Sequence, residues 1–232
     1  MTPERSARLR AALNRRQPDL TVITDFVNKQ RNLSALVRNC DAVGIMRLHA
    51  VLGQEDYRAY RGTAMGSHRW VAVERHASVS QAITGLSAEG YQILAAHPGE
   101  AALDYREVDY TRATALLFGA ERRGVSPEAR DRVDGFITVP MVGMVESYNV
   151  SVAAGIVLAE AQHQRRQAGF YDQCRIDDST YQRLLFEWAY PDLRAYCEAR
   201  SLAYPPLDSE GELLEPAAWY AAVRAGTAPR AE

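Results

Sequence analysis

Asn32 and Arg38 bound the segment NLSALVR, which follows an apolar stretch at residues 21–27. Arginine presents a planar fork of donors that suits phosphate recognition, and asparagine offers both a donor and an acceptor. On a helix Ser34 and Arg38 share a face but Asn32 and Arg38 do not, because six residues turn the chain through about 600°. The alternative interpretation makes Asn32 an N-cap and Arg38 a solvated arginine. The apolar neighbours of Arg38 favour a helix packed on a sheet, which leaves the arginine at a boundary where it needs a partner.

Three further loops combine glycine with polar side chains. They read HPGE at 97–100, GAERRG at 119–124 and PMVGMVESYN at 140–149. Glycine lets the backbone approach a ligand closely, and a loop rich in glycine and methionine suits a largely neutral, partly apolar guest. Each loop follows an apolar run. We therefore expect all three at the carboxyl ends of strands, where open α/β sheets bind their ligands.

Several other chemistries lack their sequence patterns. Neither GxGxxG nor GxxxxGK[ST] occurs, and there is no GxSxG nucleophile elbow. The histidines show no metal-ligand spacing, so no metal is expected. Cys40, Cys174 and Cys197 are far apart and odd in number, which indicates neither a disulfide framework nor a zinc site. Cys40 is expected to be a small packed residue rather than a nucleophile.

Hydrophobic periodicity predicts alternating strands and helices around these loops. Strands are expected at 21–27, 47–52, 70–75, 91–96, 114–118 and 136–139, and helices at 33–43, 78–89 and 150–167. Gly44 and Gly90 end the first two helices, and the small apolar residues VSVAAGIVLAEA predict burial of the first half of the third. Such alternation indicates an α/β fold with a mostly parallel sheet covered by helices on both faces.

The amino-terminal end is strongly basic. Thr2-Pro3-Glu4 predicts the start of a helix that runs to about Arg16. Its arginines are Arg5, Arg8, Arg10, Arg15 and Arg16. Residues 1–76 carry 13 basic and 7 acidic groups, although the whole chain has a net charge of −2. This local excess favours contact with a polyanion, and a solvated basic face is the alternative.

The rest of the composition bounds the domain organisation. We expect a basic helix at 1–17, a sheet domain at 18–168 and a helical extension at 169–232, irregular from Pro205 onward. Hydrophobic residues make up 47% of the chain and charged residues 24%, which excludes a wholly disordered protein. No run of about 18 apolar residues and no signal peptide occur, so a cytoplasmic protein with no membrane partner is expected.

The motifs together resemble a known family. NLSALVR followed by CDAVG, then FGAERRGVS, then VPMVGMVESYNVSVAAGIVLAEAQ are similar in order and spacing to the three motifs of the SPOUT methyltransferases of the SpoU type. RRQPDLTV, DYREVDYTR and QRLLFEWAYP resemble the TrmH branch, the tRNA (guanosine-18) 2′-O-methyltransferases. The resemblance implies 2′-O-methylation of guanosine 18 in the D-loop of tRNA, with S-adenosylmethionine as cofactor. It also implies a deep trefoil knot at the carboxyl end of the catalytic domain, and a homodimer.

The same resemblance assigns residues by position. Arg38 matches the family's catalytic arginine, and Asn32 matches the asparagine of the first motif. The cofactor-contacting positions are Ala96, Gly119, Val139 and Tyr148, surrounded by Glu121, Ser147 and Asn149. The basic helix would contact tRNA phosphates, with help from Arg165 and Arg166.

Departures from the family pattern keep alternatives open. Family members commonly read HKPH where this chain has NKQR at 28–31, QSLN where it has ESYN at 146–149, and threonine at Ala96. One alternative is a SpoU-type methyltransferase that acts on another RNA, such as rRNA. A second is a non-catalytic RNA-binding protein of the same fold. The least favoured is a dehydrogenase on a Rossmann-like sheet, which lacks its glycine fingerprint.

Overall fold

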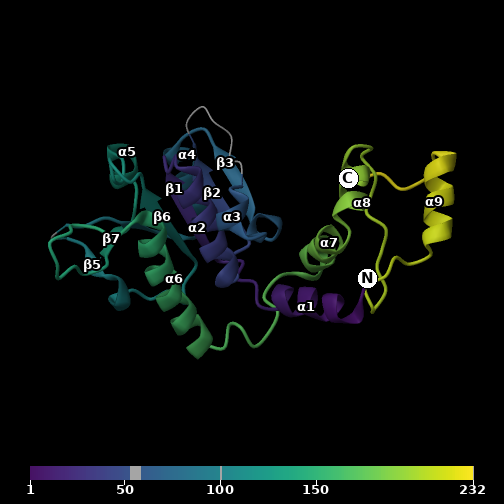
Figure 1. The fold of residues 1–232 in the computed structure, drawn as a ribbon, viewed down its shortest axis with the longest axis horizontal. Coiled ribbons are helices and arrows are strands. Elements are labelled where there is room, and N and C mark those ends of the chain that lie inside the picture. Colours follow the sequence, from purple (N-terminus) through teal and green to yellow (C-terminus); the bar gives the residue numbers. More distant parts are fainter. Residues whose placement is uncertain (53–58, 100, 232) are drawn as a thin grey trace. The chain divides into compact units, whose positions relative to one another are not determined.

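One parallel sheet organises the chain between Arg16 and Gln173 (Figure 1). The computed structural model describes residues 1–52, 59–99 and 101–231, so Glu100 of the predicted HPGE loop lies outside the described residues. Within them, seven strands pair in the order β3-β2-β1-β6-β4-β7-β5, and every pair is parallel. The strands are β1 (Leu20–Asp25), β2 (Arg47–Val51), β3 (Ala72–His76), β4 (Gln92–Ala96), β5 (Leu103–Asp104), β6 (Thr114–Gly119) and β7 (Gly135–Thr138). The predicted α/β class with a mostly parallel sheet is confirmed.

Helices cover both faces of this sheet, as predicted. The helices are α2 (Gln30–Ala42), α3 (Arg61–Ala64), α4 (Val79–Ala88), α5 (Pro127–Arg130) and α6 (Val150–Gln167), with 3₁₀ turns at Ser67–Arg69 and Tyr105–Glu107. On one face α2 and α6 share a core with Leu116 and Phe118 of β6. On the other face α4 and α5 share a core with Ala115 and Leu117 of the same strand. Alternate residues of a strand therefore enter different cores, which explains the continuous apolar runs in the sequence.

The ends of α2 and α4 follow from local backbone chemistry. Gly44 (φ 88°) and Gly90 (φ 85°) lie in the left-handed region just after these helices, which confirms the predicted stops. Ser78 caps α4 by accepting a hydrogen bond from the backbone N–H of Gln81 at 3.2 Å. Helix α2 begins at Gln30, ahead of the predicted residue 33, because its first turn is polar and gives no hydrophobic signal.

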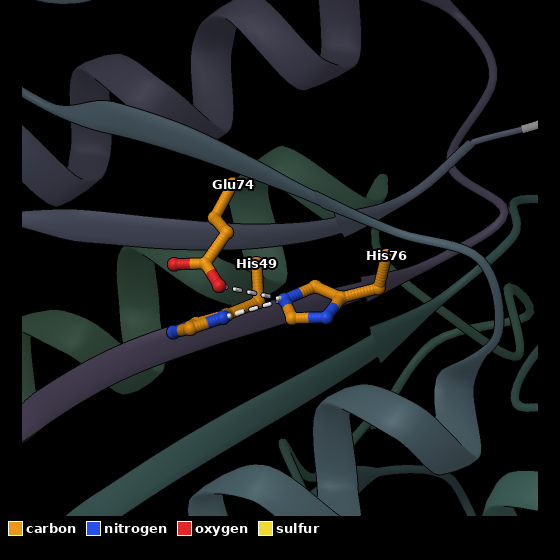
Figure 2. Close-up of side chains that lie close together, drawn as sticks. All are labelled: His49, Glu74 and His76. Carbon is orange, nitrogen blue, oxygen red and sulfur yellow. Dashed lines mark hydrogen bonds and ion pairs between the residues drawn. The ribbon is translucent and has the colours of Figure 1, made fainter.

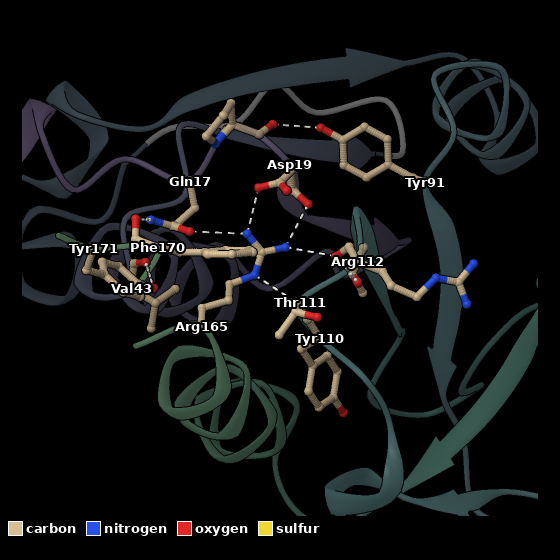
Figure 3. Close-up of polar contacts among 12 residues, drawn as sticks. Gln17, Asp19, Val43, Tyr91, Tyr110, Thr111, Arg112, Arg165, Phe170 and Tyr171 are labelled. Carbon is tan, nitrogen blue, oxygen red and sulfur yellow. Dashed lines mark hydrogen bonds and ion pairs between the residues drawn. The ribbon is translucent and has the colours of Figure 1, made fainter. Parts of the chain in front are cut away.

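Arg165 ties the last turn of α6 to the segments that lead into β1 and β6 (Figure 3). Its side chain is fully buried, and its guanidinium donates to the Asp19 carboxylate at 2.6 Å. It also donates to the carbonyl oxygens of Tyr110 and Arg112 at 2.8 and 2.9 Å. Two more hydrogen bonds reach the Asp19 carbonyl and the Gln17 side chain. We call these five residues the Arg165 cluster. It fixes the amino-terminal ends of the two central strands.

Met1–Arg15 and the chain from Cys174 onward form a second compact unit. Its helices are α1 (Pro3–Leu13), α7 (Asp178–Ala189), α8 (Pro191–Glu198) and α9 (Pro216–Ala225). Thr2 caps α1 as predicted, and Leu9 and Leu13 form its buried stripe. The helix ends at Leu13, earlier than predicted. The prediction of an irregular tail is wrong at α9, where Pro216 occupies the first turn of a helix.

No helix among the described residues combines the length and the apolar character needed to cross a membrane.

Candidate active site

A cavity of about 540 Å³ opens at the carboxyl ends of β4, β6 and β7. Every cofactor-contacting position assigned from the sequence lines it: Ala96, Gly119, Glu121, Val139, Ser147, Tyr148 and Asn149. The three strand-end positions among them are half-buried, and the others are exposed. The structure therefore brings the three predicted loops to one site, as expected for neighbouring parallel strands.

A tight turn over Gly119 shapes one wall of the cavity. The backbone N–H of Gly124 donates to the carbonyl of Ala120 at 2.8 Å, which folds the GAERRG loop back on the end of β6. A Cβ at Gly119 would overlap the backbone of Gly124 and Val125. The buried carboxylate of Asp25, at the end of β1, accepts from the backbone N–H of Ser126 at 2.7 Å and anchors the far end of the turn. Gly119 is thus required by close approach, not by its own dihedral angles.

We expect Gly119→Ala to lower the free energy of unfolding by about 1–3 kcal/mol, because the added methyl group meets backbone that cannot rotate away. Urea denaturation followed by circular dichroism measures this loss. Gly99→Ala is the matched control, since a Cβ at Gly99 meets open space. Equal stability of the two variants would contradict the close-approach explanation.

Asn32, Glu121 and Asn149 form a polar cluster at the cavity, one residue from each motif. The Asn32 side-chain amide donates to the Glu121 carboxylate, and Asn149 Nδ2 donates to Asn32 Oδ1 at 3.4 Å. Asn149 also caps α6, with its Oδ1 accepting from the backbone N–H of Ser151 at 2.9 Å. The alternative that Asn32 is an N-cap is wrong: the N-cap position of α2 is Lys29, and Asn32 lies in the first turn.

Arg38 lies on α2 away from this cluster. It does not line the cavity, its side chain is exposed, and among the described residues its guanidinium has no hydrogen bond or ion pair. The rise of a helix separates Arg38 from Asn32 by about 9 Å along the axis. The Arg38 guanidinium is therefore exposed to solvent and available to an external ligand.

Sequence reasoning missed other residues that line the cavity. Lys29, Arg122 and Arg123 supply positive charge to the lining, which also contains the carboxylates of Glu121 and Glu146. Arg122 and Arg123 belong to the GAERRG loop, and Lys29 lies just before NLSALVR. Their place in or beside these motifs is the sequence signal that could have identified them.

His97 also lines the cavity, and its ring lies 5.9 Å from that of Phe136. Burial, and then the charge of Arg130, lower the pKa of His97, so its ring is neutral at neutral pH. A neutral imidazole can donate or accept one hydrogen bond in the cavity without adding charge.

The predicted phosphate-binding arginines differ in their environments. Arg5, Arg8 and Arg15 are exposed. Arg5 donates to the carbonyl of Trp188 at 3.4 Å, and Arg10 donates to the carbonyl of Ser209 at 2.9 Å. The exposed Arg166 packs over the ring of Tyr171, with 5.7 Å from its guanidinium carbon to the ring centroid.

Arg16 and Arg165 are structural residues rather than RNA contacts, so the prediction for these two is wrong. Arg16 is 2% exposed and bonds the Asp41 carboxylate at 2.8 Å and the Ile45 carbonyl at 3.0 Å. Arg165 is fully buried in its cluster. A guanidinium that is buried and held by a carboxylate cannot reach a phosphate without breaking the fold.

The arrangement suits a ligand with a neutral, partly apolar body and a polar end. Phe118, Ile137 and Val139 give the cavity an apolar wall at the strand ends. Backbone groups there can recognise a ring by hydrogen bonds, and the exposed basic side chains of the lining can meet a polyanion. Cys40, buried in the core, has its pKa raised mainly by burial and is not a nucleophile, as predicted.

Comparison with known proteins agrees with this geometry. A model of the SpoU rRNA methylase family matches residues 19–159, and a model described as SpoU, rRNA methylase, C-terminal, matches residues 163–216. The chain belongs to the SpoU rRNA methylase family. The family resemblance seen in the motifs is therefore confirmed.

Individual relatives match most of the chain. The tRNA (guanosine(18)-2′-O)-methyltransferase of Escherichia coli (strain K12) is 43% identical over 227 residues, which cover 97% of this chain and 99% of the relative. The enzyme of the same name from Thermus thermophilus is 48% identical over 187 residues, covering 81% and 96%.

Solved SpoU structures share the fold. The TrmH/SpoU tRNA modifying enzyme of A. aeolicus superposes with a TM-score of 0.78 at 41% identity, covering 82% of this chain and 97% of that one. The SpoU methyltransferase AviRb from Streptomyces viridochromogenes, solved in complex with AdoMet, gives a TM-score of 0.59 at 26% identity, covering 65% and 62%.

Proposed function

We propose that this protein methylates the ribose 2′-hydroxyl of guanosine 18 in the D-loop of tRNA, with S-adenosylmethionine as methyl donor. The observation that carries the proposal is the near-full-length similarity to the Escherichia coli methyltransferase of that specificity. The site supports it, because Asn32, Glu121 and Asn149 bring the three family motifs to one cavity. A tRNA substrate also favours action in the cytoplasm.

S-adenosylmethionine fits the cavity in size and chemistry. Small-molecule sites commonly enclose about 300–1,000 Å³, and this cavity has about 540 Å³. Backbone groups at Ala96, Gly119 and Val139 would hold the adenosyl part, and Gly119 keeps the wall free of a side chain. Tyr148, Ser147 and Asn149 would close the other side. When bound, the cofactor supplies an activated methyl group on a sulfonium.

In the proposed mechanism Arg38 binds the nucleotide as a cation. Arginine stays protonated in proteins, so it cannot take the 2′-hydroxyl proton as a base. Its fork instead holds a phosphate and the 2′-oxygen, orients them, and stabilises the negative charge that develops on that oxygen. A phosphate oxygen or water accepts the proton. The Asn32 amide, held between Glu121 and Asn149, orients the nucleotide at the cavity.

A homodimer and a deep trefoil knot belong to the same proposal. Val142, Met144, Val145 and Val152, in the 140–149 loop and the first turn of α6, are large apolar side chains exposed to solvent. Such a group of apolar side chains supports a contact with a second copy of the chain. The knot rests on the resemblance of the three motifs to those of the SPOUT methyltransferases of the SpoU type.

The decisive experiment incubates labelled S-adenosylmethionine with unmodified tRNA and maps the methylated nucleotide. We expect a single 2′-O-methyl group at guanosine 18. Label that enters rRNA but not tRNA would favour the alternative SpoU-type activity on another RNA. Absence of cofactor binding in calorimetry at millimolar concentration would favour the non-catalytic RNA-binding protein.

The basic helix is proposed to bind tRNA phosphates through Arg5, Arg8, Arg10 and Arg15, with Arg166 in support. We expect the double variant Arg8→Ala and Arg15→Ala to bind tRNA more weakly and with a smaller salt dependence, by about one unit of slope per lost phosphate contact. Binding titrations over a range of KCl concentrations measure this. Arg224→Ala, an exposed arginine of the same unit, is the control. Equal salt slopes for the two proteins would contradict the assignment.

A further inference from the structure

The side chains of His49, Glu74 and His76 lie close together on β2 and β3, at one edge of the sheet (Figure 2). Strand β3 is an edge strand and β2 is its neighbour, whereas the cavity lies at β6, β4 and β7. His49 pairs in register with Glu74, and His76 follows two residues later on β3. Residues two apart on a strand project to the same face, so all three side chains are presented together by paired backbone.

Their ligand atoms already lie at distances close to those of a metal site. His49 Nδ1 and His76 Nε2 are 2.8 Å apart, and His76 Nε2 is 3.7 Å from Glu74 Oε1. All three atoms lie within 4.8 Å of one another. Neighbouring ligands of a tetrahedral zinc ion, each about 2.0–2.1 Å from the metal, are about 3.4 Å apart. Small side-chain rotations are therefore enough to place one ion among them.

The donors are chemically available. His49 is buried, and its Nδ1 already faces His76 Nε2 across their hydrogen bond. Arg47 contacts the other oxygen of Glu74, Oε2, at 3.2 Å. Both members of that ion pair are about half exposed, so it holds Glu74 only weakly. Glu74 Oε1 is left facing the imidazoles.

We propose that His49 Nδ1, His76 Nε2 and Glu74 Oε1 bind one Zn²⁺ ion, with water as the fourth ligand. Two imidazoles, one carboxylate and an open position form a donor set typical of zinc, whereas Mg²⁺ and Ca²⁺ require more oxygen ligands. The ring that donates the His49–His76 hydrogen bond moves that proton to its other nitrogen, so both rings stay neutral. The bound ion joins the edge strand to β2 and stabilises the folded state.

The test uses the untagged full-length chain after treatment with a chelator. Calorimetric titration with ZnCl₂, and visible absorption on titration with Co²⁺, are expected to show one ion per chain. The thermal unfolding temperature is expected to rise with zinc concentration, as for any ligand of the folded state. His76→Ala is expected to weaken zinc binding by more than about 100-fold, beyond the loss typical of residues that only support a ligand.

Two further variants make the test specific. Glu74→Gln changes an exposed side chain, so it keeps the fold while removing the charged oxygen ligand, and zinc binding is expected to fall by at least about 10-fold. His163→Ala removes an exposed histidine of α6 and is expected to leave zinc affinity unchanged. Failure of the unaltered chain to bind zinc at millimolar concentration would overturn the proposal. Binding that neither His76→Ala nor Glu74→Gln weakens would overturn it as well.

Discussion

Replacing Arg38 by alanine is expected to lower the rate of 2′-O-methylation by roughly 10²–10³-fold, with the unfolding temperature and the cofactor affinity unchanged. The guanidinium is exposed, lies outside the cavity lining, and has no hydrogen bond or ion pair among the residues described, so its removal breaks no contact within the fold. The loss comes from the cation that balances charge developing on the 2′-oxygen. Single-turnover methylation of unmodified tRNA, with labelled cofactor in excess, measures it.

Two companion variants make that result specific to Arg38. Arg38→Lys keeps the charge but not the planar fork, and we expect it to stay far below the unaltered protein. Near-normal activity of the lysine variant would instead mean that a point charge suffices. Arg132→Ala removes another exposed arginine, just beyond α5, and is expected to methylate normally. Similar losses in Arg132→Ala and Arg38→Ala would reveal a general charge effect.

The sheet could be predicted from sequence because burial on both faces makes the central strands largely apolar runs. The predicted strand bounds differ from those observed by at most two residues. β5 is only two residues long, Leu103 and Asp104, and so offers no periodicity to detect. The tail differs from its prediction for a related reason: Pro205 and Pro206 indicate irregular chain, while Pro216 begins a helix that Gly226 ends. Proline is compatible with irregular chain and also with the first turn of a helix, so its presence alone does not distinguish the two.

The location of the candidate site could be predicted from sequence, but the contacts between its side chains could not. Parallel strands bring their carboxyl ends to one edge, which is why three loops far apart in sequence could be predicted to meet. The hydrogen bonds from Asn32 to Glu121 and from Asn149 to Asn32 depend on how α2 and α6 enter that edge, which no local pattern encodes. His49 and His76 are 27 residues apart, and only the register of β2 and β3 brings them together.

Arg165 is buried although its sequence neighbourhood predicts exposure. The polar segment QHQRRQAG looks like a solvated helix end. Yet the buried face of α6 runs through Ala154, Leu158 and Ala161, and the same helical spacing continues to Arg165. This helical periodicity places Arg165 on the buried face of α6. The Asp19 carboxylate and nearby carbonyl oxygens accept its hydrogen bonds and so offset the cost of burying a guanidinium.

Arg165→Ala is therefore expected to lower the free energy of unfolding by about 3–5 kcal/mol. The substitution removes five hydrogen bonds at once and takes the guanidinium away from the Asp19 carboxylate and from the carbonyls of Tyr110 and Arg112. For a chain of this length the loss corresponds to a fall in unfolding temperature on the order of 10 °C. Differential scanning calorimetry and urea denaturation measure the two quantities.

Arg166→Ala is the matched control, because it removes the same charge from the next position of α6, where the side chain is exposed. Its effect on stability is expected to stay below about 0.5 kcal/mol, as for most surface substitutions. Arg165→Lys should fall between the two, since one ammonium can reach Asp19 but cannot also satisfy the carbonyls from a fixed fork. An Arg165→Ala protein with unchanged stability but weaker tRNA binding would mean that Arg165 contacts RNA, and would contradict its structural role.

The Arg165 cluster holds the starts of β1 and β6, and Asp25 and Gly119 lie at the other ends of these strands. A partial loss of methylation in Arg165→Ala would thus follow from a shift of β1 and β6, which position the cavity wall.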